Sequence, residues 1–291
     1  MSSRCARATV LNALILLAAG LVCEDTRTDW KREDDFLADR EELLKFGNIM
    51  HVQEWTDGSR NWMNESLSVC SWDGVCCMSC PGKGNRVTEI HVERNGLRGA
   101  FANSFAPALS ELRVLNVHLN NVTNFPPNVS ALTHLREAKF GRNPIHGTVP
   151  AGFASLRNLT KFNCNFCALS GQFPDVFGSL SALEETFWDG NNFTGSLPSS
   201  LASLSSLTKL SFNLNALTGP VPAGLCDLKL VHDCRIGSDT DYGPYELNSG
   251  EWQWVVRAKG NMFSCPVPPC MTNSVCNASV ADPVASPIRC Q

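Results

Sequence analysis

A unit of about 24 residues recurs along the middle of this 291-residue chain, and it restricts the fold more than any other feature. Four copies align without gaps, and their strand-like stretches begin at Leu135, Leu159, Leu183 and Leu207. Two less regular copies precede them, beginning at Val87 and Leu112. In each copy the pattern L-x-x-L-x-L places apolar side chains on one face of a short strand. One such strand cannot bury that face alone, so we expect the copies to stack as a solenoid with a shared core.

Each copy continues into a second recurring segment of the form N-x-L-x-G-x-L-P. Its Asn recurs at Asn95, Asn120, Asn143, Asn191 and Asn215. An inward-facing amide at this bend can satisfy backbone groups that no regular ladder reaches, and Cys167 takes the position once. The Gly that follows permits a positive φ, which Asn124 can also adopt in the second copy, and the Pro then ends strand pairing. This segment therefore predicts a turn towards the convex side.

A solenoid exposes its core at both ends, so the repeats from residue 86 to residue 237 need a cap on each side. Residues 24–85 are expected to form the N-terminal cap. Apolar residues between Leu37 and Phe46 indicate a helix, and Trp55 and Trp62 supply bulk against the first repeat.

The cap also contains a dense group of cysteines. In the sequence CSWDGVCC, the outer cysteines Cys70 and Cys77 bracket a Trp and a Gly, and we expect these two to pair. Cys76 with Cys80 is then the simplest remaining pair. Closing such short loops stabilises a fold by roughly 2–3 kcal/mol each.

The C-terminal end interrupts the repeat. A seventh strand around Cys234 keeps the register and predicts a bend Asn near Asp239, but the motif resumes only at Asn261. Residues 238–260 are therefore expected to be an insertion, and 261–291 a second Cys-rich cap. Pairs such as Cys226–Cys234 and Cys265–Cys270 would staple this end.

The N-terminus predicts secretion. Arg4 and Arg7 precede an apolar run that is too short to span a membrane comfortably, so we expect a signal peptide at 1–23, with cleavage after Gly20 or Cys23. Fourteen cysteines indicate an oxidising compartment. Glycosylation sequons occur at Asn64, Asn121, Asn128, Asn158, Asn192 and Asn277. These features predict an extracellular glycoprotein whose mature chain has no membrane span.

The composition and motifs disfavour several kinds of chemistry. A net charge of −4 argues against nucleic acid as a partner, because nucleic acid requires a clustered basic surface. Two C-x-x-C motifs, Cys77–Cys80 and Cys164–Cys167, could form a zinc site or a redox pair, but in a secreted chain they more often belong to a disulfide framework or a buried core. Acids on an open sheet exclude too little water for glycosidase chemistry. We therefore expect no enzyme activity, no cofactor and no metal.

The positions between the buried ones on each strand should face solvent and form a binding surface. Three of them carry apolar residues that the repeat does not require there: Phe166, Phe187 and Leu214. Aromatic residues inside a polar and charged rim are typical of an interface centre. The rim is expected to consist of Lys161, Asn163, Asn165, Glu185, Asp189, Lys209 and Asn213.

The sequence CSWDGVCC and the repeat N-x-L-x-G-x-L-P resemble the plant-type extracellular leucine-rich-repeat family, which includes receptor-like protein ectodomains and polygalacturonase inhibitors. The resemblance covers about residues 37 to 270. It implies an α/β fold, a right-handed solenoid or horseshoe with a concave parallel β-sheet, 3₁₀ or irregular turns outside, and disulfide-stapled caps at both ends.

The resemblance also implies recognition of an extracellular protein or peptide ligand. The function expected first is therefore a secreted protein- or peptide-binding module. The alternatives are an inhibitor of a secreted, polygalacturonase-like glycan-cleaving enzyme, and a structural wall or matrix glycoprotein. The chain departs from the inhibitors in having about seven repeats and an insertion in the last.

Overall fold

The computed structural model describes residues 31–56, 61–80, 84–228, 233–235, 245–246, 252–253 and 261–263. The predicted signal peptide, most of the insertion, the sequon at Asn277 and the pair Cys265–Cys270 lie outside these residues. Cys226 is disulfide-bonded. The structure does not describe the side chain of Cys234, so the pairing of Cys226 with Cys234 stays a prediction.

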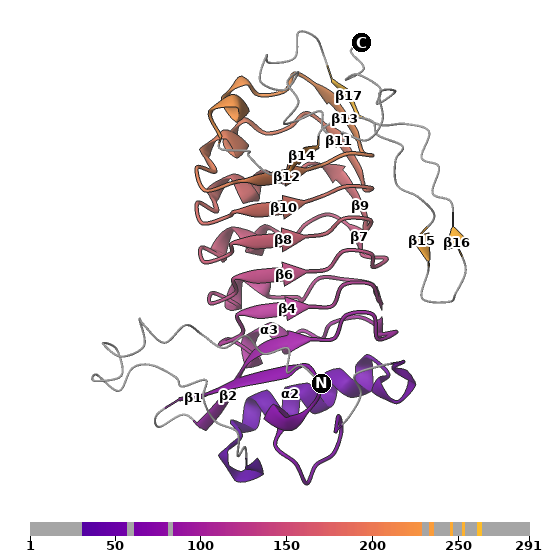
Figure 1. The fold of residues 1–291 in the computed structure, drawn as a ribbon, viewed down its shortest axis with the longest axis vertical. Coiled ribbons are helices and arrows are strands. Elements are labelled where there is room, and N and C mark those ends of the chain that lie inside the picture. Colours follow the sequence, from indigo (N-terminus) through magenta and orange to yellow (C-terminus); the bar gives the residue numbers. More distant parts are fainter. Residues whose placement is uncertain are drawn as a thin grey trace.

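Eight strands form the larger sheet, in the order β1-β2-β4-β6-β8-β10-β12-β14. They are β1 Val75–Cys80, β2 Gly84–His91, β4 Val114–Asn116, β6 Glu137–Lys139, β8 Lys161–Asn163, β10 Glu185–Phe187, β12 Lys209–Ser211 and β14 Asp233–Arg235. β1 runs antiparallel to β2, and every later neighbour is parallel. Figure 1 shows the strands stacked one above another away from the cap. The predicted right-handed α/β solenoid with a parallel concave sheet is confirmed.

A second parallel sheet lies beside the first and was not predicted from the sequence. It contains β7 His146–Gly147, β9 Ala168–Gln172, β11 Asn192–Gly195, β13 Ala216–Gly219 and β17 Met262–Phe263, and β3 Arg98–Gly99 pairs with β5 Asn121–Val122 near the cap. We call the five-stranded sheet the side sheet. The recurring Gly lies in it with positive φ, as at Gly171 (φ 86°), where an L side chain would be strained. Asn124 does not have the positive φ that the sequence allowed. Its side chain instead accepts from the backbone N–H of Phe101 and donates to the carbonyl of Phe101.

Short helices cover the convex side. They are α3 Phe105–Ala108, η4 Val129–Ala131, η5 Ala151–Ser155, η6 Asp175–Ser179, η7 Ser199–Ser203 and η8 Ala223–Asp227. From η5 on, each begins directly after the repeat's Pro, whose fixed φ suits the entry to a helix. The 3₁₀ turns that the family resemblance implies are therefore present.

A continuous apolar core runs through the repeats, and aromatic rings fill its centre. Phe162, Phe177 and Trp188 are buried to 1% exposure or less. The ring of Phe162 lies 4.6 Å from that of Trp188, and Phe177 lies 4.7 Å from both. Rings at these distances stabilise one another beyond the area they bury. The inward strand positions thus do what the repeat pattern predicts.

The bend asparagines form a buried ladder along the solenoid. Nδ2 of Asn143 donates to the carbonyls of Val117 (2.9 Å) and Phe140 (2.7 Å), and its Oδ1 accepts from the amide of Val122 (2.9 Å). Asn120, Asn191 and Asn215 repeat this pattern. Asn261 continues it beyond the interruption, since its Oδ1 accepts from the amide of Leu217 at 3.1 Å. The role predicted for these amides is confirmed.

Cys167 replaces the bend Asn in the fourth repeat and forms a disulfide with Cys164. Both cysteines are buried, with exposures of 3% and 0%. Of the two interpretations left open by the sequence, a disulfide and a pair of small apolar residues, the structure has the disulfide. This cross-link stands where the other repeats have an amide.

The N-terminal cap packs a helix and two tryptophans against the first repeat. The helix α2 spans Leu37–Ile49, and the shorter turns are η1 Arg32–Asp34, η2 Val52–Glu54 and η3 Val69–Ser71. The rings of Trp55 and Trp62 lie 5.0 Å apart, and both contact Phe46. The strands β15 Tyr245–Glu246 and β16 Trp252–Gln253 pair antiparallel with each other. Within the described residues, no helix is both long and apolar enough to cross a bilayer.

The cysteines of the cap agree with one predicted pairing and not with the other. Cys70 and Cys77 form a disulfide. Cys76 and Cys80 both lie on strand β1, where residues four apart are separated by about 13 Å. A disulfide requires Cα atoms within about 7 Å, so the predicted pair Cys76–Cys80 is wrong. Cys76 is disulfide-bonded to a partner outside the described side chains.

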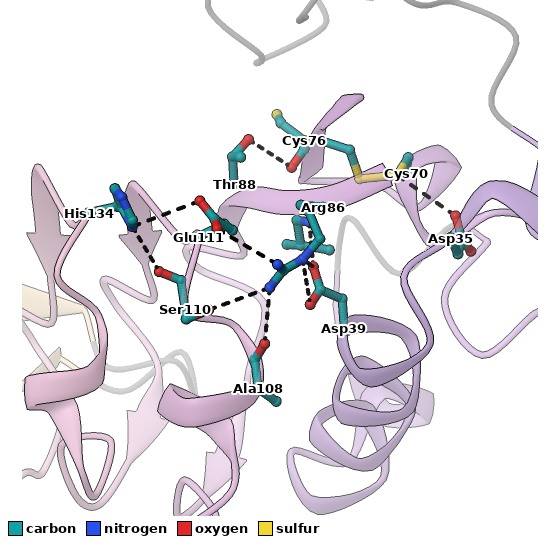
Figure 2. Close-up of polar contacts among 12 residues, drawn as sticks. Asp35, Asp39, Cys70, Cys76, Arg86, Thr88, Ala108, Ser110, Glu111 and His134 are labelled. Atoms are coloured by element: carbon teal, nitrogen blue, oxygen red, sulfur yellow. Dashed lines mark hydrogen bonds and ion pairs between the residues drawn. A yellow bond between two sulfur atoms is a disulfide. The ribbon is translucent and has the colours of Figure 1, made fainter. Parts of the chain in front are cut away.

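A buried ionic network joins the cap to the repeats (Figure 2). Asp39 of α2 is fully buried and accepts hydrogen bonds from Nε of Arg86 (3.1 Å) and from the amide of Val87 (2.7 Å). Arg86 also pairs with Glu111 at 3.7 Å, and Glu111 lies 3.8 Å from His134. Burial raises the pKa of Asp39, although Arg86 acts in the opposite direction. These bonds fix α2 on the first strand of the solenoid.

Candidate ligand-binding face

The side chains that point away from the core along β2 to β12 form what we call the concave face. Because the strands are in register, these side chains fall into four columns that cross the repeats. The first column is Glu89, Val114, Glu137, Lys161, Glu185 and Lys209, and the second is His91, Asn116, Lys139, Asn163, Phe187 and Ser211. The third is Glu93, His118, Gly141, Asn165, Asp189 and Asn213, and the fourth is Arg94, Leu119, Arg142, Phe166, Gly190 and Leu214.

The first column carries charges that alternate in sign from the third repeat on. Glu185 lies between Lys161 (3.5 Å) and Lys209 (3.0 Å), one repeat to each side. Burial alone would raise the pKa of Glu185, but the hydrogen bond from Lys209 and the charges of both lysines outweigh it, so the pKa is lowered. The rim predicted from Lys161, Glu185 and Lys209 is therefore a ladder of mutually paired charges.

The second column places one aromatic residue among polar neighbours. Phe187 is half-buried and lies in register between Asn163 of β8 and Ser211 of β12. Asn163 is also half-buried. An apolar ring at this position has no counterpart in the other described repeats, so Phe187 remains the best candidate for an anchoring contact.

Three of the predicted site residues are not available to a partner. Leu214 is 7% exposed, Asp189 2% and Asn213 1%. Asp189 is occupied inside the protein, because it accepts hydrogen bonds from the hydroxyl of Ser211 and from the amide of Asn213 (3.1 Å). The apolar patch predicted from Phe166, Phe187 and Leu214 is therefore reduced to its two half-buried aromatics.

The fourth column has a left-handed backbone in all six repeats. Its φ angles range from 51° at Phe166 to 66° at Gly190. The side chain of Phe166 leans onto the next repeat, where a Cβ at residue 190 would meet its ring at 2.3 Å. The guanidinium of Arg142 lies 5.7 Å from the centre of the same ring. Phe166 thus packs along the solenoid and keeps only part of its ring exposed.

The third column contains a glycine that the sequence analysis did not single out. A Cβ on Gly141 would lie 2.1 Å from Oδ1 of Asn165, 2.5 Å from Oδ1 of Asn163 and 2.9 Å from Nδ1 of His118. Oδ1 of Asn165 and Nδ1 of His118 are both buried without a hydrogen-bond partner among the described residues. Burial, followed by the charge of Arg142, lowers the pKa of His118 to about 4. The signal in the sequence was the absence of a side chain at this one position of the column.

One group of residues has the spacing of a metal site. Ligand atoms of Cys76, Glu89 and His91 all lie within 4.8 Å of one another. The sulfur of Cys76 is held in a disulfide, however, and Nε2 of His91 already contacts Oε2 of Glu89 at 2.8 Å. A disulfide sulfur does not supply the thiolate that a metal requires. This group is therefore not a candidate metal centre.

The described sequons lie away from the concave face. Asn121 and Asn192 are exposed at the edges of β5 and β11, and Asn128 and Asn158 are exposed beside η4 and η5. Asn64 is exposed in the cap. Glycans at these positions would leave the four columns uncovered.

Comparisons with known proteins return several plant receptors and a plant ice-binding protein, which is 20% identical with a TM-score of 0.60 over 78% of this chain and 64% of that one. No protein-family model matches the chain. Receptor-like protein kinase 7 of Arabidopsis thaliana is 33% identical over 98 residues, which is 33% of this chain but only 10% of that protein. The LRR ectodomain of the receptor kinase SOBIR1 from Arabidopsis thaliana is 25% identical, with a TM-score of 0.56, and the match covers 66% of this chain and 100% of that one.

The Arabidopsis HAESA ectodomain, solved in complex with an IDA peptide hormone ligand, is 20% identical, with a TM-score of 0.52, and the match covers 81% of this chain and 44% of that one. At this identity the likeness concerns the fold alone.

Proposed function

Because this chain is a leucine-rich-repeat protein of the plant extracellular type, we propose that it is a secreted recognition module that binds an extended extracellular peptide along its concave face. The observation that carries the proposal is Phe187, a half-buried aromatic ring in the middle of a polar sheet. The fold does not need an apolar residue there, because the core is already filled from the other side of β10. Aromatic anchors surrounded by polar groups dominate binding at many interfaces.

The surroundings of Phe187 support an extended ligand. Strands in a sheet lie about 4.8 Å apart, so a peptide that crosses them meets a new side chain of each column at every repeat. Lys161, Glu185 and Lys209 are paired with one another and border this path. Paired charges favour correct alignment of a ligand more than they increase its affinity.

The extracellular setting belongs to the same proposal. Residues 1–23 serve as a signal peptide, 24–85 as the N-terminal cap, 86–237 as the repeats, 238–260 as an insertion and 261–291 as the C-terminal cap. The exposed sequons carry glycans on the convex side, the side sheet and the cap. The peptide ligand of HAESA is a precedent for a peptide on this fold.

The test uses a phage-displayed library of random peptides selected on the full protein. Selected peptides are expected to crosslink to β8, β10 and β12, and Phe187→Ala is expected to weaken their binding at least about tenfold. The control is His146→Ala, an exposed position on the side sheet. Crosslinks to the convex side, or equal binding by wild type and Phe187→Ala, would contradict the proposal. Inhibition of a polygalacturonase without any selected peptide would favour an inhibitor instead.

A further inference from the structure

Of the six residues in the third column, only Gly141 has no side chain. Gly141 is buried at the centre of the concave face, and its neighbours in the column are His118 and Asn165. Its φ lies outside the left-handed range, so the backbone does not require glycine at this position. A side chain is excluded at residue 141 because the side-chain amide of Asn165 occupies the space where its Cβ would lie.

Three polar atoms converge over Gly141, of which the two oxygens accept hydrogen bonds and the imidazole nitrogen accepts or donates according to its tautomer. Two are the amide oxygens of Asn163 and Asn165, and the third is Nδ1 of His118. Only one of the three atoms has a hydrogen-bond partner among the described residues: Oδ1 of Asn163 accepts from the backbone N–H of Asn165 at 3.0 Å. A buried acceptor without a donor is costly, and such atoms are normally satisfied by water or a ligand. A group that fits here therefore brings at least one hydrogen-bond donor, for Oδ1 of Asn165.

The charges around Gly141 decide what kind of donor fits. Arg142, Lys139 and Arg94 all act to lower the pKa of His118, and they oppose any further positive charge. Lys139 is also paired with Glu137. Glu93 acts to raise the pKa of His118 and only partly offsets the three positive charges. A cation such as an ammonium group is disfavoured by these side chains, and an anion is disfavoured by the two amide oxygens. An uncharged donor remains.

We propose that the concave face has a subsite over Gly141 that takes one uncharged donor group of the ligand, the primary carboxamide of an Asn or Gln side chain. The inference rests on the proposed function and adds a specificity-determining contact to it. A carboxamide carries both a donor NH₂ and an acceptor carbonyl, so it can pair with Oδ1 of Asn165 and with Nδ1 of His118 in either tautomer. In the free protein Asn165 covers the subsite. Its side-chain amide makes no hydrogen bond among the described residues, so a small rotation admits the carboxamide while Oδ1 of Asn165 stays at the edge of the subsite and accepts from it.

Acetamide is the probe that tests this subsite without the natural ligand. The full protein is titrated with acetamide while the ring signals of His118 are followed by NMR. We expect a saturable shift in the millimolar range, the affinity of a small fragment, and none with acetate or methylammonium. The ring of His146, exposed on the side sheet, is the internal control. The proposal would be overturned if the His118 signals did not shift at acetamide concentrations well above the millimolar range, or if the charged probes gave equal shifts.

Two variants make the result specific. Gly141→Ala is expected to abolish the acetamide shift, whereas Gly152→Ala on the convex side, also at an ordinary φ, keeps it. Asn165→Ala only removes atoms, and it is expected to weaken acetamide several-fold. Unchanged binding in either of these concave variants would contradict the subsite. A negative acetamide result leaves the concave binding of peptides intact, because crosslinking of the selected peptides tests that function separately.

Discussion

The ring of Phe166 lies over the backbone of Gly190 in the next repeat, so that a Cβ at residue 190 would come within 2.3 Å of Cδ1 and 2.4 Å of Cε1 of that ring. Both residues have a left-handed backbone, with φ of 51° and 66°. The contact couples two neighbouring repeats on the concave side. It also explains why an aromatic residue at this position is only partly available to a ligand.

Replacing Gly190 by Ala is expected to destabilise the protein by more than the backbone strain alone. The left-handed conformation costs a non-glycine residue about 1–2 kcal/mol, and displacement of Phe166 adds to it. Gly147→Ala is the matched control, because Gly147 has φ of 89° and no atom within 4 Å of its added Cβ. Urea unfolding measures both variants. An equal loss of stability in the two would show that Phe166 is not held against Gly190.

Replacing the bend residue Asn191 by Ala is expected to cost about 3 kcal/mol of unfolding free energy, because buried backbone groups lose their partners. Its Nδ2 donates to the carbonyls of Cys164 (2.8 Å) and Trp188 (2.9 Å), and its Oδ1 accepts from the amide of Leu169 (3.1 Å). Asn103→Ala, at an exposed position, is the control, with a change of less than about 0.5 kcal/mol. Chemical denaturation measures both variants. Equal unfolding midpoints for Asn191→Ala and Asn103→Ala would show that the asparagine ladder does not stabilise the fold.

The charge ladder predicts a pH-dependent contribution from Glu185. Its pKa in the folded protein lies below the ordinary value of 4.5, so the ionised form is favoured by folding. The contribution is present above the unfolded pKa and is lost as the pH falls through the folded pKa. Glu185→Gln is therefore expected to cost about 0.5 kcal/mol near neutral pH and progressively less as the pH falls below the ordinary pKa of 4.5. A difference between wild type and variant that does not change with pH would argue against ion pairing with Lys161 and Lys209.

His118 is expected to stay neutral well into the acidic range, because burial and then Arg142 lower its pKa to about 4. In an NMR titration its ring signals should not move between neutral pH and about pH 5.5. Arg142→Ala removes the largest charge effect and should raise the midpoint. A midpoint near the ordinary value of 6.5 in the wild type would show that His118 is not buried beside Gly141.

The repeat itself was readable in the sequence because each repeat position has one dominant physical requirement. Inward positions such as Leu210 must be apolar, and the bend residue Asn215 must satisfy backbone groups of its own and the preceding repeat. These requirements are local and recur every 24 residues, so the solenoid, the Asn ladder and the continuation at Asn261 were all predicted. The pair Cys76–Cys80 failed because sequence proximity cannot show that both residues lie on one extended strand.

The concave face depended on contacts that sequence periodicity does not encode. Periodicity placed Phe166, Leu214 and Asp189 on this face, yet it could not show that Phe166 leans onto Gly190 or that Asp189 is consumed by Ser211 and Asn213. Such contacts join residues one repeat apart, and they depend on how side chains tilt once the strands are stacked.

The 24-residue repeat alone determined that this chain is a stacked solenoid with an open sheet. Only the tertiary structure decided which residues of that sheet remain free to bind, because side chains of adjacent repeats compete for the same surface. At Gly141 the absence of a side chain lets Asn165 and His118 approach with their polar atoms unsatisfied.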